Sequence, residues 1–164
     1  MKLVDALRRN MLGGTHHSLG VILFSYTIAY FLCTMVINYI LNFPAWLTEE
    51  PNLVKEYFIK NGIRFFIMDW FIVAAYIYLG HAFGSYLGLK SNFEKLGAFV
   101  LMTSALSGFF YFLFMNVTSL RNTIFYRWFN KAGIKAIVYD AIFVGSIYVV
   151  FHKMLSKFKY HNLS

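Results

Sequence analysis

Residues 19–43 read LGVILFSYTIAYFLCTMVINYILNF, an uninterrupted stretch without a charged side chain. An α-helix rises about 1.5 Å per residue, so this stretch is long enough to cross a hydrocarbon core of about 30 Å. It is too long for the apolar core of a signal peptide, and it lacks a small-residue cleavage site. We therefore predict a membrane-spanning helix, because a backbone in lipid must satisfy its own hydrogen bonds.

Three further apolar stretches follow in this chain of 164 residues. They are Phe65–Leu87, which contains Asp69; Leu96–Val117, which carries no charge; and Ile134–Phe151, which contains Asp140. Charged residues make up 13% of the chain, about half the share that is usual in a soluble domain. We predict an all-α, polytopic membrane protein in which four transmembrane helices form a single membrane domain, residues 1–164.

The second and fourth stretches belong to an internal repeat. The segment GIRFFIMDWF, residues 62–71, aligns with GIKAIVYDAI, residues 133–142, at an offset of 71 positions. Polar residues are rare inside membrane spans, so their recurrence is more informative than matching leucines. The polar residues that the offset aligns include Asp69 with Asp140, His81 with His152 and Ser85 with Ser156.

A short amphipathic segment precedes each of these two spans, residues 53–60 and residues 124–131. Apolar residues on one face and basic residues on the other suit a helix that lies in the membrane interface. Gly62 and Gly133 follow, and glycine permits a sharp turn into the next span. We predict two tandem two-helix repeats, each with a short interfacial amphipathic helix, and two flanking segments. The repeats are residues 19–87 and 88–152; the flanks are a polar or interfacial segment, residues 1–18, and a basic tail, residues 153–164.

Asp69 and Asp140 are the candidate polar or ion site, because acids inside a membrane are costly and usually face a cavity or a partner. Asp69 lies about 9 Å along its helix from Ile63, which places it at a shallow depth. A structural carboxylate bonded to a neighbouring helix fits that depth equally well. The basic residues at the same end are candidates for binding a lipid head group or another anion: Arg64, Lys135, Arg121 and Arg127.

The two repeated histidines and a set of small polar residues are the other candidates. Paired imidazoles at equal depth can ligate haem or a transition metal, so His81 and His152 are a candidate metal site. An interfacial histidine with one edge in water is the simpler interpretation, and no cofactor is expected in that case. Polar residues at helical spacing in the first and third spans are typical of helix–helix contacts or, alternatively, of a polar pathway: Thr34, Asn38, Asn42, Ser104 and Ser107.

One part of the chain resembles a known family. The run INYILNFPAW, residues 37–46, is followed by a connection and by a span that opens with YFIKNGIRFF. This resembles the GtrA family of small four-helix membrane proteins over about a third of the chain, whereas the second half lacks the paired asparagines. The resemblance implies a role in moving polyprenyl-phosphate-linked sugars across membranes. The residues that carry it are Asn38, Tyr39, Asn42 and Trp46.

Charge and motifs narrow the function classes. The net charge of +8 fits contact with a lipid bilayer through anionic head groups, and no soluble basic domain is present to hold nucleic acid. Basic residues divide almost evenly between the two predicted sides, so only the usual dominance of the first helix favours an N-terminus inside. No motif of a hydrolase, zinc protease or P-loop enzyme occurs, so we do not expect an enzyme.

We expect a small integral membrane transporter, channel or lipid-carrier flippase with a shallow paired-Asp site and a basic rim. Four helices enclose little room, so a homo-oligomer is expected. One alternative is a non-catalytic structural subunit of a larger membrane complex. The other is a haem- or metal-binding membrane protein that uses His81 and His152.

Overall fold

The computed structural model describes residues 18–161, with side chains through residue 158. Within that range the regular structure is helical, and no strand occurs. Four helical stretches are long and apolar enough to cross a membrane: Leu19–Ile40, Gly62–Tyr86, Asn92–Asn116 and Ile134–Phe158. The all-α class and the four candidate spans are confirmed, and they are compatible with a multi-pass integral membrane protein. Most of the predicted segment 1–18 and the end of the predicted tail lie outside the described residues.

The first span consists of α2 (Leu19–Cys33), continued by the π-helical η1 (Thr34–Ile40). It begins where the Ser18 side chain accepts a hydrogen bond from the Val21 backbone N–H, an ordinary N-cap. It ends before the predicted Phe43, because Asn42 adopts the left-handed conformation with φ 47°. Proline at the start of the next short helix, α3 (Phe43–Thr48), favours the new direction.

The second and third spans are α5 (Gly62–Tyr86) and α6 (Asn92–Asn116). The sequence places the start of the third span at Leu96, but α6 begins four residues earlier. A capping box explains the earlier start, since Ser91 Oγ accepts from Glu94 N at 3.1 Å and Ser91 N donates to Glu94 Oε2 at 3.0 Å. The fourth span, α8 (Ile134–His161), continues well past the predicted end at Phe151.

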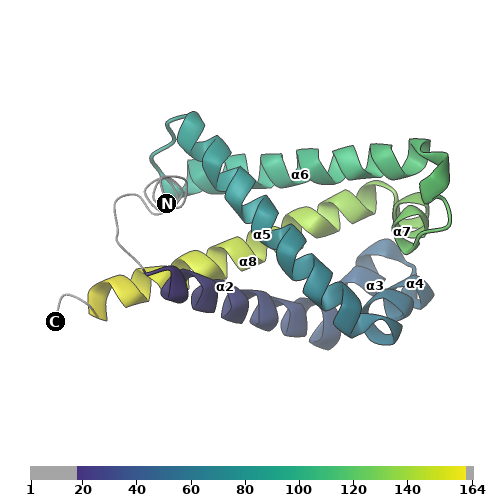
Figure 1. Ribbon diagram of the computed structural model, residues 1–164, viewed down its shortest axis with the longest axis horizontal. Coiled ribbons are helices and arrows are strands. Elements are labelled where there is room, and N and C mark those ends of the chain that lie inside the picture. Colours follow the sequence, from purple (N-terminus) through teal and green to yellow (C-terminus); the bar gives the residue numbers. More distant parts are fainter. Residues whose placement is uncertain (1–17, 162–164) are drawn as a thin grey trace.

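Short helices join the spans at one end of the molecule (Figure 1). They are α3, α4 (Pro51–Lys55), the π-helical η2 (Glu56–Lys60), η3 (Thr118–Leu120) and α7 (Ile124–Ala132). Gly133 turns α7 into α8 with a φ of 56°, as predicted. The prediction for Gly62 is wrong: the turn lies at Asn61, and Gly62 begins α5. Asn61 closes the preceding helix itself, because its side-chain amide donates to Glu56 O at 3.0 Å.

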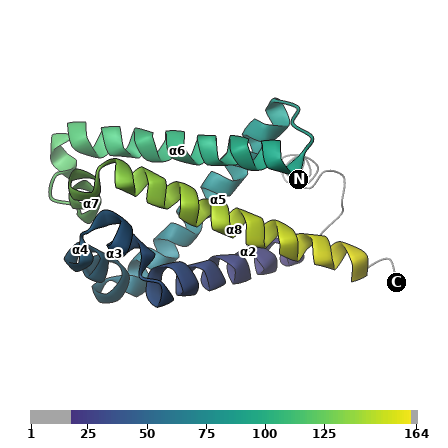
Figure 2. The ribbon, with the colours of Figure 1, turned by 180° about the vertical axis from the view of Figure 1, so that it is seen from behind.

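The long helices form an up-and-down arrangement in which α2 and α6 run in one direction and α5 and α8 return (Figure 1). α8 packs between α2 and α6, and α5 runs diagonally across one side of α8 from the short helices toward the start of α6 (Figures 1 and 2). The approach of α5 to α6 depends on Gly80, where an added Cβ would lie 2.4 Å from Phe99 Cδ2.

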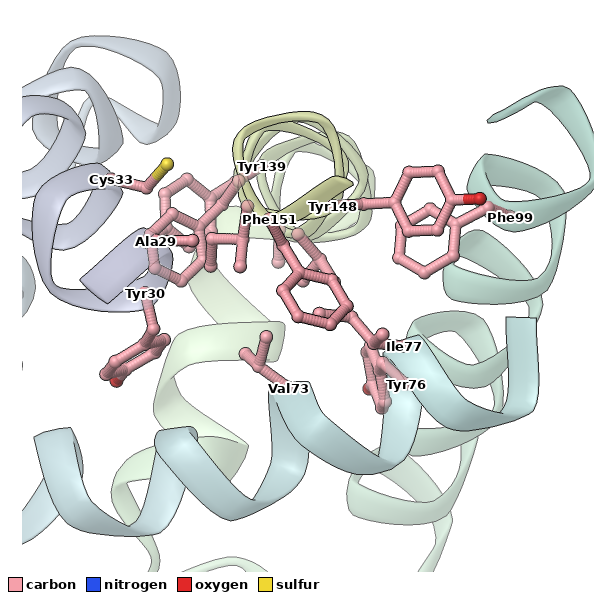
Figure 3. Packing of buried hydrophobic residues seen from close by; sticks show 14 of the residues in the cluster. Ala29, Tyr30, Cys33, Val73, Tyr76, Ile77, Phe99, Tyr139, Tyr148 and Phe151 are labelled. Carbon is pink, nitrogen blue, oxygen red and sulfur yellow. The ribbon is translucent and has the colours of Figure 1, made fainter. Parts of the chain in front are cut away.

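Buried aromatic residues fill the space around α8 (Figure 3). The ring of Tyr148 stacks on Phe99 of α6, with centroids 4.3 Å apart and planes 17° apart. Across the helix, the fully buried Ala29 leaves room for α2 to approach. Long tyrosines bridge α2 to α5: the Tyr30 hydroxyl donates to Phe66 O at 2.9 Å, and the Tyr26 hydroxyl donates to Trp70 O. These bonds satisfy hydroxyl groups that lie within the apolar spans.

Candidate functional site

A cavity of about 180 Å³ lies between α5, α6 and α8, under the short helices α7 and η2. This volume exceeds the roughly 150 Å³ of an engineered apolar cavity that holds benzene. Most of the lining is aromatic or aliphatic. The lining residues are Tyr57, Phe58, Met68, Asp69, Ile72, Val73, Tyr76, Phe110, Phe114, Phe125, Trp128, Phe129, Tyr139, Asp140, Phe143 and Val144.

Two carboxylates from different helices line this one cavity. Asp69 is the eighth residue of α5, and Asp140 is the seventh residue of α8. The Tyr57 hydroxyl donates to Asp69 Oδ1 at 2.8 Å, and the Ser107 hydroxyl donates to Asp140 Oδ2 at 2.5 Å. Each acid therefore has one oxygen held by a neighbouring element. The structure thus brings together the two acids that the sequence predicts as a polar site.

Tyr57 is a site residue that the sequence analysis missed. Its ring is buried and stacks on Phe65, with centroids 4.3 Å and planes 11° apart. Burial, together with the charge of the adjacent Asp69, raises the pKa of Tyr57 well above its ordinary value. Its hydroxyl therefore remains a proton donor to the carboxylate. In the sequence, Tyr57 is visible only as one of two adjacent aromatic residues in the amphipathic segment 53–60. Such aromatic residues are equally typical of an interfacial helix.

Aromatic residues line the cavity together with the two acids. Tyr139 stacks on Phe143 with centroids 5.6 Å apart and planes 8° apart, and its ring meets Trp128 at 5.9 Å. On the α6 side, Phe114 stacks on Phe125 at 5.4 Å. The face of an aromatic ring carries partial negative charge. A ring face that meets the cavity therefore has the same electrostatic sign as the two carboxylates.

The basic residues near this end form ion pairs across the two halves of the chain. Arg127 binds both oxygens of Glu56, with Nη1–Oε2 2.8 Å and Nη2–Oε1 2.6 Å. The Lys135 ammonium lies 2.8 Å from Glu49 Oε1. Hydrogen bonding from these cations holds the pKa of both glutamates below its usual range. Two of the predicted anion-binding residues thus already hold carboxylates.

The remaining basic side chains of the predicted rim are either paired or exposed. Lys131 Nζ lies 3.1 Å from Glu50 Oε2 and adds a third ion pair between the halves. Arg64 and Arg121, also predicted to bind anions, are exposed. None of these basic residues lines the cavity. A head group held by Arg64 or Arg121 would therefore lie outside the chamber that contains the acids.

The predicted small polar residues divide between helix contacts and the surface. Asn38 is buried, and its Oδ1 accepts a 2.8 Å hydrogen bond from the Tyr139 hydroxyl, which links the first span to the fourth. Ser107 links the third span to the fourth through Asp140. Thr34 is buried, Ser104 is half-buried, and Asn42 is exposed at the helix end.

His81 and His152 meet near the opposite end of the bundle. Their ring centroids are 6.1 Å apart, and His152 also packs on Tyr148 at 4.3 Å. A space of only about 10 Å³ adjoins His81. Across residues 18–161, no group of three or more His, Cys, Asp or Glu side chains is placed to hold a metal ion. The pair is therefore formed as predicted, but without a third protein ligand from those residue types.

Residues that the 71-residue offset relates meet each other in the structure. Glu56 and Arg127 form an ion pair at this separation, and the rings of Tyr57 and Trp128 are 5.8 Å apart. The same offset relates the two acids in the cavity and the two histidines. The alignment at this offset therefore carries a signal for contacts between the aligned residues.

Comparison with known proteins does not assign this chain to a family. The resemblance of residues 37–46 and the following span to the GtrA family therefore stays a prediction. The chain matches no family model, and neither a curated protein nor a solved structure is significantly similar to it.

Proposed function

We propose that this protein is a small membrane transporter whose ligand occupies the cavity at Asp69 and Asp140. The observation that carries the proposal is that two acids, each from a different apolar helix, line one chamber. Acids placed among membrane spans are costly and mark substrate or ion pathways more often than structural contacts. An apolar pocket with a few convergent polar groups is also the usual form of a ligand site.

The proposed architecture is a duplication with a two-fold axis along the membrane normal. Support comes from the residues at an offset of 71, because symmetry-related side chains meet only near the axis that relates them. The common orientation of the two halves fits parallel repeats of this kind (Figure 1). In this proposal the short helices α4, η2 and α7 lie in the membrane interface, and the ligand binds between the repeats.

Access to the cavity would be controlled by the short helices. Tyr57 and Phe58 of η2, with Phe125, Trp128 and Phe129 of α7, cover the acids on this side. The ion pairs Glu56–Arg127 and Glu49–Lys135 hold the two halves together there. Relative motion of the repeats would separate these groups and open the chamber, as in alternating-access transporters.

Thiol labelling tests the proposal without knowledge of the substrate. Cys33 is the single cysteine of the chain and is buried, so Cys33→Ala provides a background for Ile72→Cys, which places one thiol in the cavity lining. A membrane-impermeant thiosulfonate is added to sealed vesicles of either orientation. Ala75→Cys is the matched control, because it lies on the same helix, is exposed and does not line the cavity.

A transporter should be labelled at position 72 from both sides of the membrane and at position 75 from neither side. Labelling of position 72 from one side only would overturn transport and leave a binding protein. Protection from both sides, with loss of stability on purification, would instead support the structural subunit of a larger complex. Chemical crosslinking of the same vesicles reports whether the protein is a homo-oligomer.

A second candidate function is transition-metal binding by His81 and His152. The separation of their ring centroids, 6.1 Å, is the observation that favours it. Two imidazoles on facing helices are suitable ligands for Cu or Zn. The small space beside His81 offers no room for a porphyrin in this conformation, so a metal ion is favoured over haem.

A further inference from the structure

We propose that the ligand of the cavity is a small organic cation, an ammonium or quaternary ammonium group on an apolar body. This inference rests on the proposed function, because it concerns the same cavity, and it names the chemical class of the transported substrate. It differs from the anionic lipid carrier that the sequence resemblance implies.

The distribution of charge decides the sign of the ligand. Asp69 and Asp140 are the charged residues among the lining side chains, and neither lysine, arginine nor histidine joins them within the described part of the chain. Three basic side chains at this end, Arg127, Lys131 and Lys135, form ion pairs with glutamates. A phosphate or sulfate in the cavity would face two carboxylates without a cation to offset them.

The two carboxylates are also suitable partners for a positive charge. Each receives one protein hydrogen bond, from Tyr57 or from Ser107, and a carboxylate accepts several. When both acids are ionised in one low-dielectric chamber they repel each other, and a bound cation relieves this repulsion. Hydrogen bonds between an ammonium and a carboxylate are stronger than those between neutral groups.

The walls favour an organic cation over an inorganic one. Ca²⁺ and Mg²⁺ require six or more oxygen ligands, whereas this chamber presents mostly aromatic carbon. Quaternary ammonium groups are recognised by aromatic faces through cation–π attraction. Trp128 and Tyr139, whose rings meet at 71° with centroids 5.9 Å apart, line the cavity together with Asp140. The volume of about 180 Å³ fits a body about the size of one aromatic ring.

Tryptophan fluorescence provides a direct binding measurement. The chain contains three tryptophans, and Trp128 lines the cavity. A Trp46→Phe, Trp70→Phe background therefore leaves Trp128 as the reporter. Three probes with one aromatic ring are titrated into the protein in detergent: benzyltrimethylammonium, its neutral carbon isostere neopentylbenzene, and the anion benzenesulfonate. We expect saturable quenching by the cation, weaker quenching by the neutral isostere and none by the anion.

Substitution of the acids connects the binding to the site. Asp69→Asn or Asp140→Asn should weaken binding of benzyltrimethylammonium by at least about tenfold, because each substitution removes a negative charge that attracts the bound cation. Asp69→Glu retains the charge and should recover most of the affinity. Glu94→Gln is the matched control, since Glu94 is an exposed acid outside the cavity. Circular dichroism verifies the fold of each variant.

Two results would overturn the proposal. One is binding of benzenesulfonate as tight as that of the cation, a comparison that needs no acid variant and stands even if those variants fail to fold. The other is unchanged cation affinity in folded Asp69→Asn and Asp140→Asn proteins. Failure of transport is distinguishable: cation binding with thiol access from one side only would retain the ligand class and reject the transporter. Thiol access from both sides with tighter binding of the anion would retain the transporter and reject the cationic ligand.

Discussion

Arg127 binds Glu56 through both guanidinium nitrogens, at 2.8 and 2.6 Å, and the two residues are 71 positions apart. They occupy equivalent places in the aligned segments, one on η2 and one on α7. A bidentate pair of this kind fixes orientation as well as distance. It joins η2 to α7, the two helices that cover the cavity. The pairs Lys131–Glu50 and Lys135–Glu49 join α7 and α8 to the connection between α3 and α4.

Removal of this ion pair should loosen the cover over the cavity. Both side chains are partly exposed, so Glu56→Gln should lower the free energy of unfolding by only about 0.5–1 kcal/mol. The charge swap Glu56→Arg, Arg127→Glu should recover part of this loss. Thermal unfolding in detergent measures both effects, and high salt should reduce the difference between the wild type and Glu56→Gln.

Acid should weaken the same contact. Arg127 lowers the pKa of Glu56 in the folded protein, so the pair stabilises the fold above the ordinary pKa of a glutamate. This stabilisation is lost as the pH falls through the lowered pKa. The unfolding temperature of the wild type should therefore decrease toward acidic pH more steeply than that of Glu56→Gln. Parallel pH profiles for the two proteins would contradict the assignment.

Gly80 should tolerate no larger side chain. A Cβ there would lie 2.4 Å from Phe99 Cδ2, and the stacking of Phe99 on Tyr148 limits its movement. Gly80→Ala should lower the free energy of unfolding by about 1–3 kcal/mol, the usual cost of overpacking. Gly84→Ala is the control on the same helix, because nothing lies within 4 Å of its added Cβ. Equal unfolding temperatures for the two variants would show that α5 and α6 separate easily.

Tyr57→Phe should remove the hydrogen bond to Asp69 while it retains the ring that stacks on Phe65. A buried hydrogen bond of this kind contributes about 1 kcal/mol, and more when the acceptor is charged. Tyr78→Phe is the control, since Tyr78 is exposed on α5. In a double-mutant cycle with Asp69→Asn, the measured unfolding free energies should be non-additive. Additive values would mean that the two groups do not interact.

The histidine pair should be tested with added metal. We expect Cu²⁺ to bind the purified protein. Each single variant, His81→Ala or His152→Ala, and the double variant that combines them should no longer bind Cu²⁺, because one imidazole alone does not complete the pair. His161→Ala, which changes a histidine near the chain end, is the control. Metal content after gel filtration gives the readout. Retention of Cu²⁺ in the double variant would exclude this site.

Much of the fold was predictable from the linear pattern of apolar residues. The four candidate spans follow from runs such as residues 19–43, because a backbone in lipid has few alternatives to a helix. Boundaries were less accurate. The first span ends early at the left-handed Asn42, and α6 begins early at the Ser91 capping box. Local side-chain hydrogen bonds and single backbone angles determine such ends, and hydropathy does not record them.

The sequence by itself determined that the chain is apolar and helical, and it identified Asp69 and Asp140 as rare acids within apolar stretches. Only the tertiary structure decided that both acids line one aromatic chamber, that Tyr57 and Ser107 hold them, and that Arg127 and Lys135 are occupied by glutamates. The physical reason is that helix formation depends on residues close in the chain, whereas these contacts depend on how the helices cross.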